Sequence, residues 1–399
     1  MDKIAEVLSR GVEKIYPSRS AFEKVLRSGK KLRLYQGFDP TGTQLHIGHL
    51  VGLMKLRQFQ LLGHKVIFLI GDGTGQAGDP SGKTKGREKF FTRDELRVNA
   101  RDYVLQAKRV VQFEGKNPAE VLFNGDWLNK LTLIDILDLF GKFSVQQLIE
   151  RDIFQRRLKE KRPINLREFI YPILQGYDSV AMNVDLEIGG SDQTFNMLTG
   201  RTLVGMMRKK EKFVLTLPLL SDSTGRKIGK TEGNIIALTS KPSELFGMIM
   251  NLPDDVILPC FTFITSTPLP TIERYKKALL TGENPMTYKK LLAKTLITML
   301  HDEKRAIEAQ KQFEALFQGK KQPTQIPSFP FPQKGELPLF EVLVSSGLVK
   351  SRSHAKTLIR EGAVEIDGEK CIDILTPLNP KHTYHLRVGK HTFLKLQPK

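Results

Sequence analysis

Apolar runs and amphipathic stretches alternate through the first 235 residues of the chain. Residues 45–63 carry apolar side chains at helical spacing and end at Gly63, which predicts a helix. A continuous apolar run such as KVIFLIG is typical of a parallel strand that is buried on both faces. Because strands alternate with helices, the pattern predicts an α/β fold with a doubly wound parallel sheet. The predicted strands are residues 32–39, 65–71, 119–125 and 184–190.

The pattern changes after residue 235. Residues 236–318 are predominantly helical in pattern, with charged faces, and residues 319–336 carry four prolines that predict a semi-extended linker. Residues 337–399 form a small separate module of mixed α+β pattern. The predicted division is therefore 1–235, 236–318, a linker at 319–336, and 337–399.

Charge and composition narrow the class of protein. The net charge of +19 favours a polyanionic partner, although a basic surface that is only solvated gives the same number. The hydrophobic share of 40% is ordinary for a globular protein, and no apolar run approaches the roughly 18 residues of a membrane span. The two cysteines form no CxxC motif, and the N-terminal stretch is not a secretion signal. We therefore expect a cytoplasmic protein without a structural metal.

Three motifs carry candidate nucleotide chemistry at the carboxyl ends of the predicted strands. The first is His46-Ile47-Gly48-His49, whose two histidines share one helix face near the helix start, where backbone N–H groups favour phosphate. The bland alternative is a pair of surface histidines. Gly48 lacks a side chain, so an adenine ring can lie against the backbone there.

The second motif is the glycine-rich stretch from Gly71 to Gly86. It resembles a P-loop, which needs four residues between its glycines before Lys-Thr, but Gly78 and Gly82 enclose only three. A P-loop kinase is the runner-up enzyme on this motif, and a plain flexible loop is the alternative.

The third motif is Lys227-Ile228-Gly229-Lys230-Thr231. Two lysines on a glycine-flanked loop can close over a triphosphate and stabilise departing pyrophosphate. Taken alone, such a basic loop is more often only solvated.

Together and in this order, these segments resemble a class I aminoacyl-tRNA synthetase. Residues 46–49 match its HIGH signature, and residues 227–231 match its KMSKS loop in a variant form. More narrowly, the segments YQGFDPTGTQLHIGH, GDPSGK, YPILQGYDS and GGSDQTFN resemble the bacterial tyrosyl-tRNA synthetases. The resemblance covers nearly the whole chain. It implies a Rossmann-like catalytic domain, a helical anticodon-binding domain and a C-terminal RNA-binding domain, with tyrosine, ATP, Mg²⁺ that accompanies ATP, and tRNA as ligands.

The resemblance also implies residue roles. Tyr35 and Asp178 would hydrogen-bond the phenolic hydroxyl of tyrosine. The remaining tyrosine-binding residues would be Asp39, Thr74, Asp79, Tyr171, Gln175 and Gln193. ATP would be bound by Gly37, Asp39, His46, Gly48, His49, Gly190, Asp192 and Lys230. The residues that stabilise the transition state and the pyrophosphate would be Thr41, His46, His49, Lys83, Arg87, Lys227, Lys230 and Thr231. A homodimer is implied through the region 127–165.

Helical spacing supports part of this assignment independently. Tyr171, Gln175 and Asp178 lie at i, i+4 and i+7, which makes one polar helix face where amphipathicity alone predicts core. A structural hydrogen-bond cluster is the alternative. Gln36 and the segment Gly71-Asp72-Gly73-Thr74 depart from the family pattern, which leaves the contacts of both undetermined.

The C-terminal module resembles the S-four type of RNA-binding domain. Ser351 is a natural N-cap, and Arg352, Lys356 and Arg360 are spaced by four to make one basic stripe on a helix. A solvated helix face is the alternative. S-four-like modules also occur in pseudouridine synthases, but an RNA-modifying enzyme leaves the HIGH-like and KIGKT segments unexplained. A non-catalytic RNA-binding relative and a tryptophanyl enzyme remain as rivals, and Tyr35 with Asp178 suits a phenol better than an indole.

Overall fold

The computed structural model describes residues 2–81, 90–228, 230–231, 234–317, 328–332, 335–349, 351–389 and 392–398. For residues 230, 231, 234, 316 and 317 it describes the backbone alone. The chain divides into two compact units, residues 1–311 and residues 312–399.

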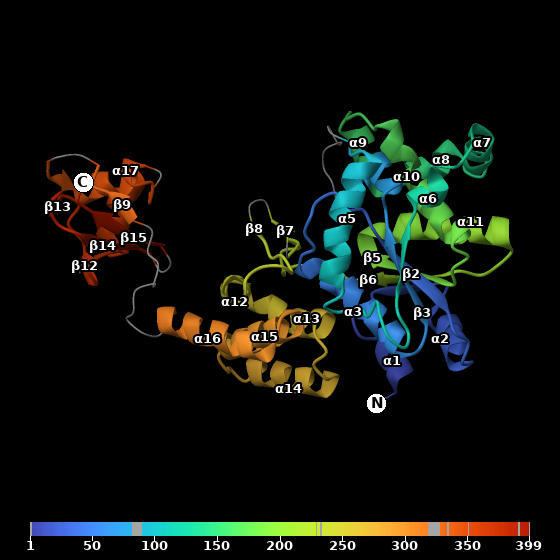
Figure 1. Ribbon diagram of the computed structural model, residues 1–399, viewed down its shortest axis with the longest axis horizontal. Helices are drawn as coiled ribbons and strands as arrows, with labels where there is room; N and C mark the ends of the chain where they lie inside the picture. Colours follow the sequence, from blue (N-terminus) through green and yellow to red (C-terminus); the bar gives the residue numbers. More distant parts are fainter. Residues whose placement is uncertain are drawn as a thin grey trace. The chain divides into compact units, whose positions relative to one another are not determined.

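A six-stranded sheet forms the centre of the first unit (Figure 1). Five of the strands are parallel, and the edge strand β1 pairs antiparallel with β6. In spatial order the strands are β1 (Lys14–Tyr16), β6 (Phe213–Leu217), β5 (Leu186–Gly190), β2 (Arg33–Phe38), β3 (Lys65–Ile70) and β4 (Glu120–Phe123). All four predicted strands are therefore present, and the doubly wound parallel fold is confirmed.

The order of the strands sets the position of a ligand site. From β2 the chain winds outward through β3 and β4, then returns to the other side of β2 for β5 and β6. The winding direction reverses between β2 and β5, where Tyr35 pairs in register with Glu187. In open α/β sheets, ligands bind in the crevice at the carboxyl ends of the strands beside such a reversal.

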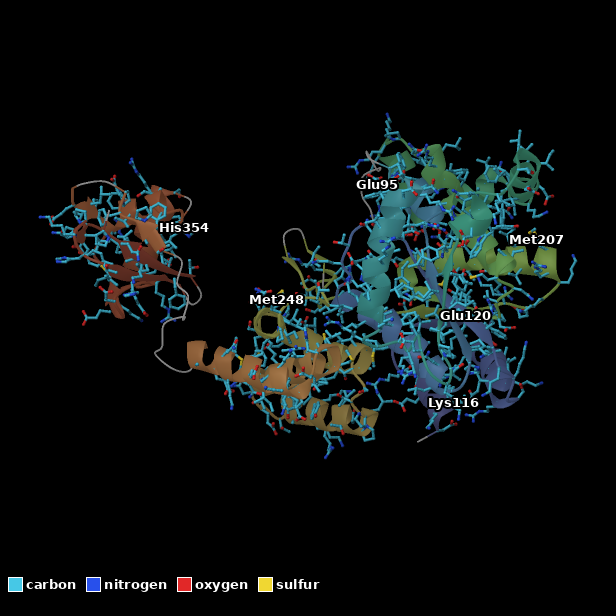
Figure 2. The ribbon with its side chains drawn as sticks, viewed as in Figure 1. Glu95, Lys116, Glu120, Met207, Met248 and His354 are labelled. Carbon is cyan, nitrogen blue, oxygen red and sulfur yellow. The ribbon has the colours of Figure 1, made fainter. Side chains whose placement is uncertain are left out.

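Helices cover the sheet where the sequence pattern predicts them. The helix α3 (Ile47–Leu61) follows β2, and its buried apolar residues pack against the sheet. The helix α5 (Arg93–Ala107) begins with the expected capping box of Thr92 and Glu95; Glu95 is labelled in Figure 2. This helix ends before the expected Phe113, because the chain turns and sets that ring edge-on against Phe68 at 5.8 Å.

The other helices of this part are short, apart from α10 and α11, which pack against each other. Their bounds are α1 (Lys3–Val7), α2 (Arg19–Arg27), α4 (Thr74–Ala77), α6 (Gly125–Leu128), α7 (Leu133–Phe140), α8 (Val145–Ile149), α9 (Asp152–Lys159), α10 (Leu166–Ala181), η1 (Ser191–Gln193) and α11 (Thr194–Arg208). Two short strands, β7 (Lys230–Thr231) and β8 (Asn234–Ile235), form a separate ribbon.

A helical group completes the first unit. Its members are α12 (Pro242–Met250), η2 (Asp254–Val256), α13 (Ile257–Ile264), α14 (Leu269–Leu280), α15 (Pro285–Leu300) and α16 (Glu303–Phe317). Among the described residues no single helix has the length and apolar composition to cross a bilayer. The pair Pro242–Met250 and Asp254–Ile264, bent by 111°, meets these two criteria only when taken together.

Two buried basic side chains join this helical group to α3; burial lowers the pKa of one of them, Lys55, to about 7. Nζ of Lys55, on α3, donates to the carbonyls of Val7 at 2.8 Å and Arg10 at 2.6 Å. The guanidinium of Arg10 in turn donates to three carbonyls at the end of α13, those of Phe261, Thr262 and Thr265. Most of these carbonyls lie at the ends of α1 and α13, where partners within the helix are lacking, so the two side chains supply donors there; the Phe261 carbonyl also accepts from Thr265 Oγ1.

The second unit has its own sheet and core. The strand order is β12 (Glu369–Cys371), β11 (Val364–Ile366), β14 (Tyr384–Val388), β15 (Thr392–Gln397) and β9 (Ser328–Pro330), with a separate pair of β10 (Leu337–Pro338) and β13 (Pro377–Leu378). The helices α17 (Leu339–Ser345) and α18 (Arg352–Arg360) complete the core. The expected linker 319–336 differs in part, because residues 328–330 pair parallel with β15 and Phe331 is buried in this core.

Candidate active site

A cavity of about 390 Å³ opens at the carboxyl ends of β2 and β5. It lies at the reversal of the sheet and is lined by residues from β2, β5, α3, α10 and the loops that follow them. The cavity brings together these residues predicted from the sequence: Tyr35, Gly37, Asp39, Thr41, His46, Gly48, His49, Thr74, Asp79, Tyr171, Gln175, Asp178, Gly190, Asp192, Gln193 and Lys227.

The HIGH-like turn is held in a reciprocal cap at the start of α3. The backbone N–H of Gly48 donates to Nδ1 of His46 at 3.2 Å, and the N–H of His46 donates to Nδ1 of His49 at 3.0 Å. Because both Nδ1 atoms accept, each neutral ring carries its proton on Nε2. Both imidazoles therefore have an Nε2–H that can donate to an anion.

Gly48 packs closely against the His46 ring. A Cβ at this position would lie 3.0 Å from the His46 ring and 3.6 Å from the carbonyl of Ile228. The turn is also fixed by residues after β8, since Ile47 donates to the Ile236 carbonyl and Leu238 donates to the Leu45 carbonyl. The segment that follows the KIGKT motif is thus attached to the HIGH-like turn by backbone hydrogen bonds.

At the inner end of the cavity Asp178 is almost fully buried. Asn124 Nδ2 donates to its Oδ2 at 3.0 Å, and Trp127 Nε1 donates to its Oδ1 at 2.8 Å. Burial raises the pKa of Asp178 well above its usual range, while these two hydrogen bonds lower it. The two contacting atoms, Asn124 Nδ2 and Trp127 Nε1, are N–H donors, so against the effect of burial this geometry favours the carboxylate form, whose remaining lone pairs can accept from a hydroxyl.

The donor Asn124 is itself anchored. Its Oδ1 accepts from the N–H of Gly73 at 2.7 Å, and the following N–H, of Gly125, donates to Asp72 Oδ1 at 2.7 Å. The buried Asp72 also accepts from Nε of Arg93 and of Arg97, one turn apart on α5. The contacts of the Gly71–Thr74 segment, which the sequence left undetermined, therefore fasten the β4–α6 turn to α5.

Beside Asp178, Tyr35 lies with its hydroxyl 2.9 Å from Ser179 Oγ. Ser179 donates to Glu187 Oε2 at 3.3 Å, Gln175 Nε2 donates to Glu187 Oε1 at 3.0 Å, and Lys212 pairs with the same carboxylate. Burial raises the pKa of the Tyr35 hydroxyl well above its usual range, and the nearby carboxylates raise it further. Tyr35 is therefore a neutral phenol at physiological pH.

Two further carboxylates lie in the cavity wall. Asp39 accepts from the Tyr171 hydroxyl at 2.9 Å and from Thr74 Oγ1 at 2.7 Å. Asp79 accepts from Gln193 Nε2 at 2.8 Å and has the buried Arg151 at 3.6 Å. With Asp178, Glu187 and Asp192, five carboxylates line one cavity, which suits a ligand that carries an ammonium group and a hydroxyl.

The structure describes some of the remaining predicted residues in full, some by their backbone alone and some not at all. Lys227 lies 3.0 Å from Asp192 Oδ2, so the ends of β5 and of the basic loop are joined by an ion pair. Lys230 and Thr231 lie in β7, and their side chains are outside the described residues. Lys83 and Arg87 also lie outside the described residues. Gln36 lines the cavity with its amide against Gly52, where a Cβ would lie 2.1 Å from Oε1.

Several residues of this site escaped the sequence analysis. Asn124 directly follows β4, at the strand end where ligand-binding side chains gather, and this position was the signal for it. Glu187 is an acid inside the apolar strand β5, which is a signal for a buried partner. Ser179 ends the segment YPILQGYDS, but its role was not predicted. Trp127 and Lys212 carry no comparable sequence signal, since only the fold brings these side chains against Asp178 and Glu187 of the cavity wall.

In the second unit, Ser351 caps α18 as expected, by accepting from the N–H of His354, which is labelled in Figure 2. Arg352 and Arg360 are exposed, and the ammonium of Lys356 lies 4.6 Å from the centre of the Phe340 ring. The basic stripe therefore consists of two exposed guanidinium groups with a partly buried lysine between them.

Comparison with known proteins agrees with this geometry. The family model for class I tRNA synthetases (W and Y) matches residues 27–318, and the model for the Tyrosine–tRNA ligase SYY-like C-terminal domain matches residues 310–394. The Tyrosine–tRNA ligase of Carboxydothermus hydrogenoformans is 42% identical, over 98% of this chain and 97% of that protein. The Tyrosine–tRNA ligase of Mannheimia succiniciproducens is 40% identical over the same shares.

Solved structures agree at the level of the fold. The C-terminally truncated mitochondrial tyrosyl-tRNA synthetase of Aspergillus nidulans has a TM-score of 0.68 and 24% identity, over 79% of this chain and 94% of that chain. The tyrosyl-tRNA synthetase of Archaeoglobus fulgidus, complexed with L-tyrosine, has a TM-score of 0.59 and 19% identity, over 78% of this chain and 100% of that chain. From the family models and the full-length identity, the chain belongs to the tyrosine–tRNA ligases of the class I tRNA synthetase family.

Proposed function

We propose that this chain joins tyrosine to its tRNA in two steps at the cavity between β2 and β5. The tyrosine carboxylate attacks the α-phosphate of ATP to form tyrosyl-adenylate and pyrophosphate, and a ribose hydroxyl at the 3′ end of the tRNA then takes the tyrosyl group. The observation that carries the proposal is one cavity with a HIGH-like pair of Nε2–H donors and a buried Asp178 beside Tyr35. No covalent protein nucleophile is needed, because positioning and charge stabilisation suffice for this chemistry.

The proposed amino-acid pocket ends at Tyr35 and Asp178, where the phenolic hydroxyl of the substrate is read. Asp79, Tyr171 and Gln175 would hold the ammonium group, with Asp39 and Thr74 beside them and Gln193 near the carboxylate. The support is the cluster of carboxylates and donor-rich side chains in one wall. A hydroxyl-reading pocket rejects an analogue without the hydroxyl, because the polar groups of the pocket then stay unpaired.

The proposed nucleotide end lies at the HIGH-like turn. Thr41, His46 and His49 would stabilise the phosphates in the transition state, Gly37, Asp39, Gly48, Gly190 and Asp192 would bind the nucleoside, and the basic groups would neutralise pyrophosphate. These basic groups are Lys83, Arg87, Lys227 and Lys230. The hydroxyl of Thr231 would assist them. Among the described residues no group of three or more His, Cys, Asp or Glu side chains is arranged to hold a metal. Mg²⁺ would therefore enter with the phosphates of ATP, which supply its oxygen ligands.

The direct test is ATP–pyrophosphate exchange with each standard amino acid in turn. We expect tyrosine alone to support exchange. Asp178→Ala removes the carboxylate that accepts from the phenol, and we expect the apparent affinity for tyrosine to fall about 10- to 100-fold. A folded variant, judged by circular dichroism and gel filtration, that keeps wild-type exchange would contradict the role of Asp178.

We also propose roles for the other parts of the chain. Residues 1–235 would be the catalytic domain, 236–318 the anticodon-binding domain, and 337–399 an RNA-binding domain that contacts the tRNA through Arg352, Lys356 and Arg360. A homodimer would form through the region 127–165, where Leu133, Ile134 and other large apolar side chains are exposed. With tRNA as its substrate, the enzyme would act in the cytoplasm.

A further inference from the structure

A chain of buried polar side chains adjoins Tyr35: Ser179 and Lys212, which do not line the cavity, and Glu187, which does. Lys212 and Ser179 are fully buried, and Glu187 and Tyr35 are exposed by only 2% and 1%. Lys212 also donates to the carbonyl of Met197 at 3.1 Å, so its ammonium is held between this carbonyl and Glu187. Such a network, closed off from water, keeps its hydrogen-bond directions fixed.

The direction of each hydrogen bond in this network follows from the number of protons that each side chain carries. Paired with the Lys212 ammonium, Glu187 is a carboxylate, which can only accept. Ser179 has one proton and donates it to this carboxylate, because a charged acceptor is preferred over a neutral hydroxyl. The Ser179 oxygen can then only accept, so in the 2.9 Å contact the Tyr35 hydroxyl is the donor.

We propose that Ser179 is a positioning residue that, held by Glu187 and Lys212, turns the hydroxyl proton of Tyr35 away from the ligand. The inference rests on the proposed function and deepens it. Tyr35 then offers oxygen lone pairs to the cavity. Asp178 does the same, since both of its partners, Asn124 and Trp127, are donors. Tyr35 and Asp178 therefore present two acceptors to the para substituent of the substrate.

This arrangement makes a chemical distinction between para substituents. The hydroxyl of tyrosine has one proton and can satisfy one of the two acceptors. The amino group of 4-aminophenylalanine has two N–H bonds and can satisfy both. A pocket with one donor and one acceptor would instead favour the hydroxyl, because the weakly accepting aniline nitrogen would face the donor.

The test compares the dissociation constants of tyrosine and 4-aminophenylalanine by titration calorimetry. The Glu187 carboxylate is a second acceptor within reach of the Tyr35 hydroxyl, so the variant Ser179→Ala/Glu187→Gln/Lys212→Met removes both acceptors and frees the Tyr35 proton to donate to the substrate oxygen. We expect the ratio of Kd for 4-aminophenylalanine to Kd for tyrosine to rise about tenfold over the wild type. Thr216→Val is the matched control, since it removes another buried hydroxyl, whose partner is the carbonyl of Lys14, and should leave the ratio unchanged.

A second variant tests the same network from its far end. In Glu187→Gln/Lys212→Met the amide oxygen stays with Gln175, and the amide NH₂ donates to Ser179. Ser179 then donates to the Tyr35 oxygen, so the Tyr35 proton turns to the cavity, and we expect the ratio to rise in the same direction.

A ratio unchanged in both variants would overturn the inference, because a loss of packing alone weakens both ligands alike. The outcome is separate from the proposed function. Absent exchange in a wild-type protein that binds both ligands would overturn the function and leave the network standing.

Discussion

The protonation state of a buried side chain in this protein depends on the backbone groups to which it is hydrogen-bonded. His64 is a clear case outside the active site. It is almost fully buried, and its Nδ1 accepts from the N–H of Leu32 at 3.2 Å. Burial lowers the pKa of His64 to about 4, and the nearby ammonium of Lys31 contributes in the same direction. Unlike a charged surface histidine, this residue stabilises the fold only while it is neutral.

The sign of the pH dependence follows. The pKa of His64 is about 4 in the folded state and about 6.5 in the unfolded state. Between these two pH values the unfolded state binds a proton at His64 and the folded state does not. The contribution of His64 to the free energy of unfolding is fully present above pH 6.5 and is lost as the pH falls towards 4. We expect His64 to lower the free energy of unfolding by about 1–2 kcal/mol at pH 5 relative to pH 7.

The measurement is the urea midpoint at pH 7 and pH 5, for the wild type and for His64→Asn. The asparagine Oδ1 can accept from Leu32 without titrating, so the variant should lose less stability between the two pH values. Equal losses in the two proteins would show that His64 is not the titrating group.

The same scale separates residues that the sequence reveals from those it does not. His46, His49, Asp178 and Tyr35 lie in recognisable segments, and the cavity gathers them. Ser179 is the last residue of the recognisable segment YPILQGYDS, whereas nothing near Lys212, in the turn before β6, marks that residue. Both side chains contact Glu187 of β5, and one-dimensional patterns do not record this tertiary contact.

At the scale of elements, local chemistry determined most boundaries. The capping box at Thr92, the N-cap at Ser351 and the apolar run of β3 were all readable from the sequence. The end of α5 and the strand β9 were not, because the ring contact of Phe113 and the pairing of residues 328–330 with β15 are long-range.

One helix has an apolar face that the described part of the first unit leaves exposed. On α7, Leu133, Ile134 and Leu137 are exposed by 71%, 73% and 55%. Exposed apolar residues clustered on one helix mark interaction sites, and α7 lies inside the region proposed for the homodimer.

We expect Ile134→Asp/Leu137→Asp to convert a dimer into monomers, because two carboxylates would have to be buried in the interface. Sedimentation velocity at several concentrations measures this. Leu280→Asp is the control, since Leu280 is equally exposed on α14, outside the proposed interface. A double variant that sediments as the wild type does would place the interface elsewhere.

At the scale of the whole molecule, the two compact units separate the two proposed activities. The cavity is built entirely from the first unit, and the basic stripe of α18 belongs to the second. The boundary for a truncation follows from β9, which belongs to the C-terminal sheet, so a cut at residue 337 would remove a sheet but leave its edge strand.

We therefore expect a chain that ends at Phe317, after α16 and before β9, to keep tyrosine-dependent exchange within about twofold and to bind tRNA at least about tenfold more weakly. Filter binding at two salt concentrations measures the second effect. Arg352→Ala/Arg360→Ala in the full chain should weaken binding in the same direction and reduce its salt dependence. Unaltered affinity in both proteins would exclude the C-terminal unit from RNA binding.

The two buried basic side chains between α3 and α13 have a mechanical consequence. Lys55 of α3 donates to the carbonyls of residues 7 and 10, and Arg10 donates to carbonyls at the end of α13. The backbone segment at residues 7–10 therefore connects α3, the helix of the HIGH-like turn, to the helical group. If α13 moves, either the N-terminal segment moves with it or the hydrogen bonds of the Arg10 guanidinium to α13 break. The first ten residues, far from the cavity in sequence and in role, thus set how stiffly the helical group is coupled to the helix that bears His46 and His49.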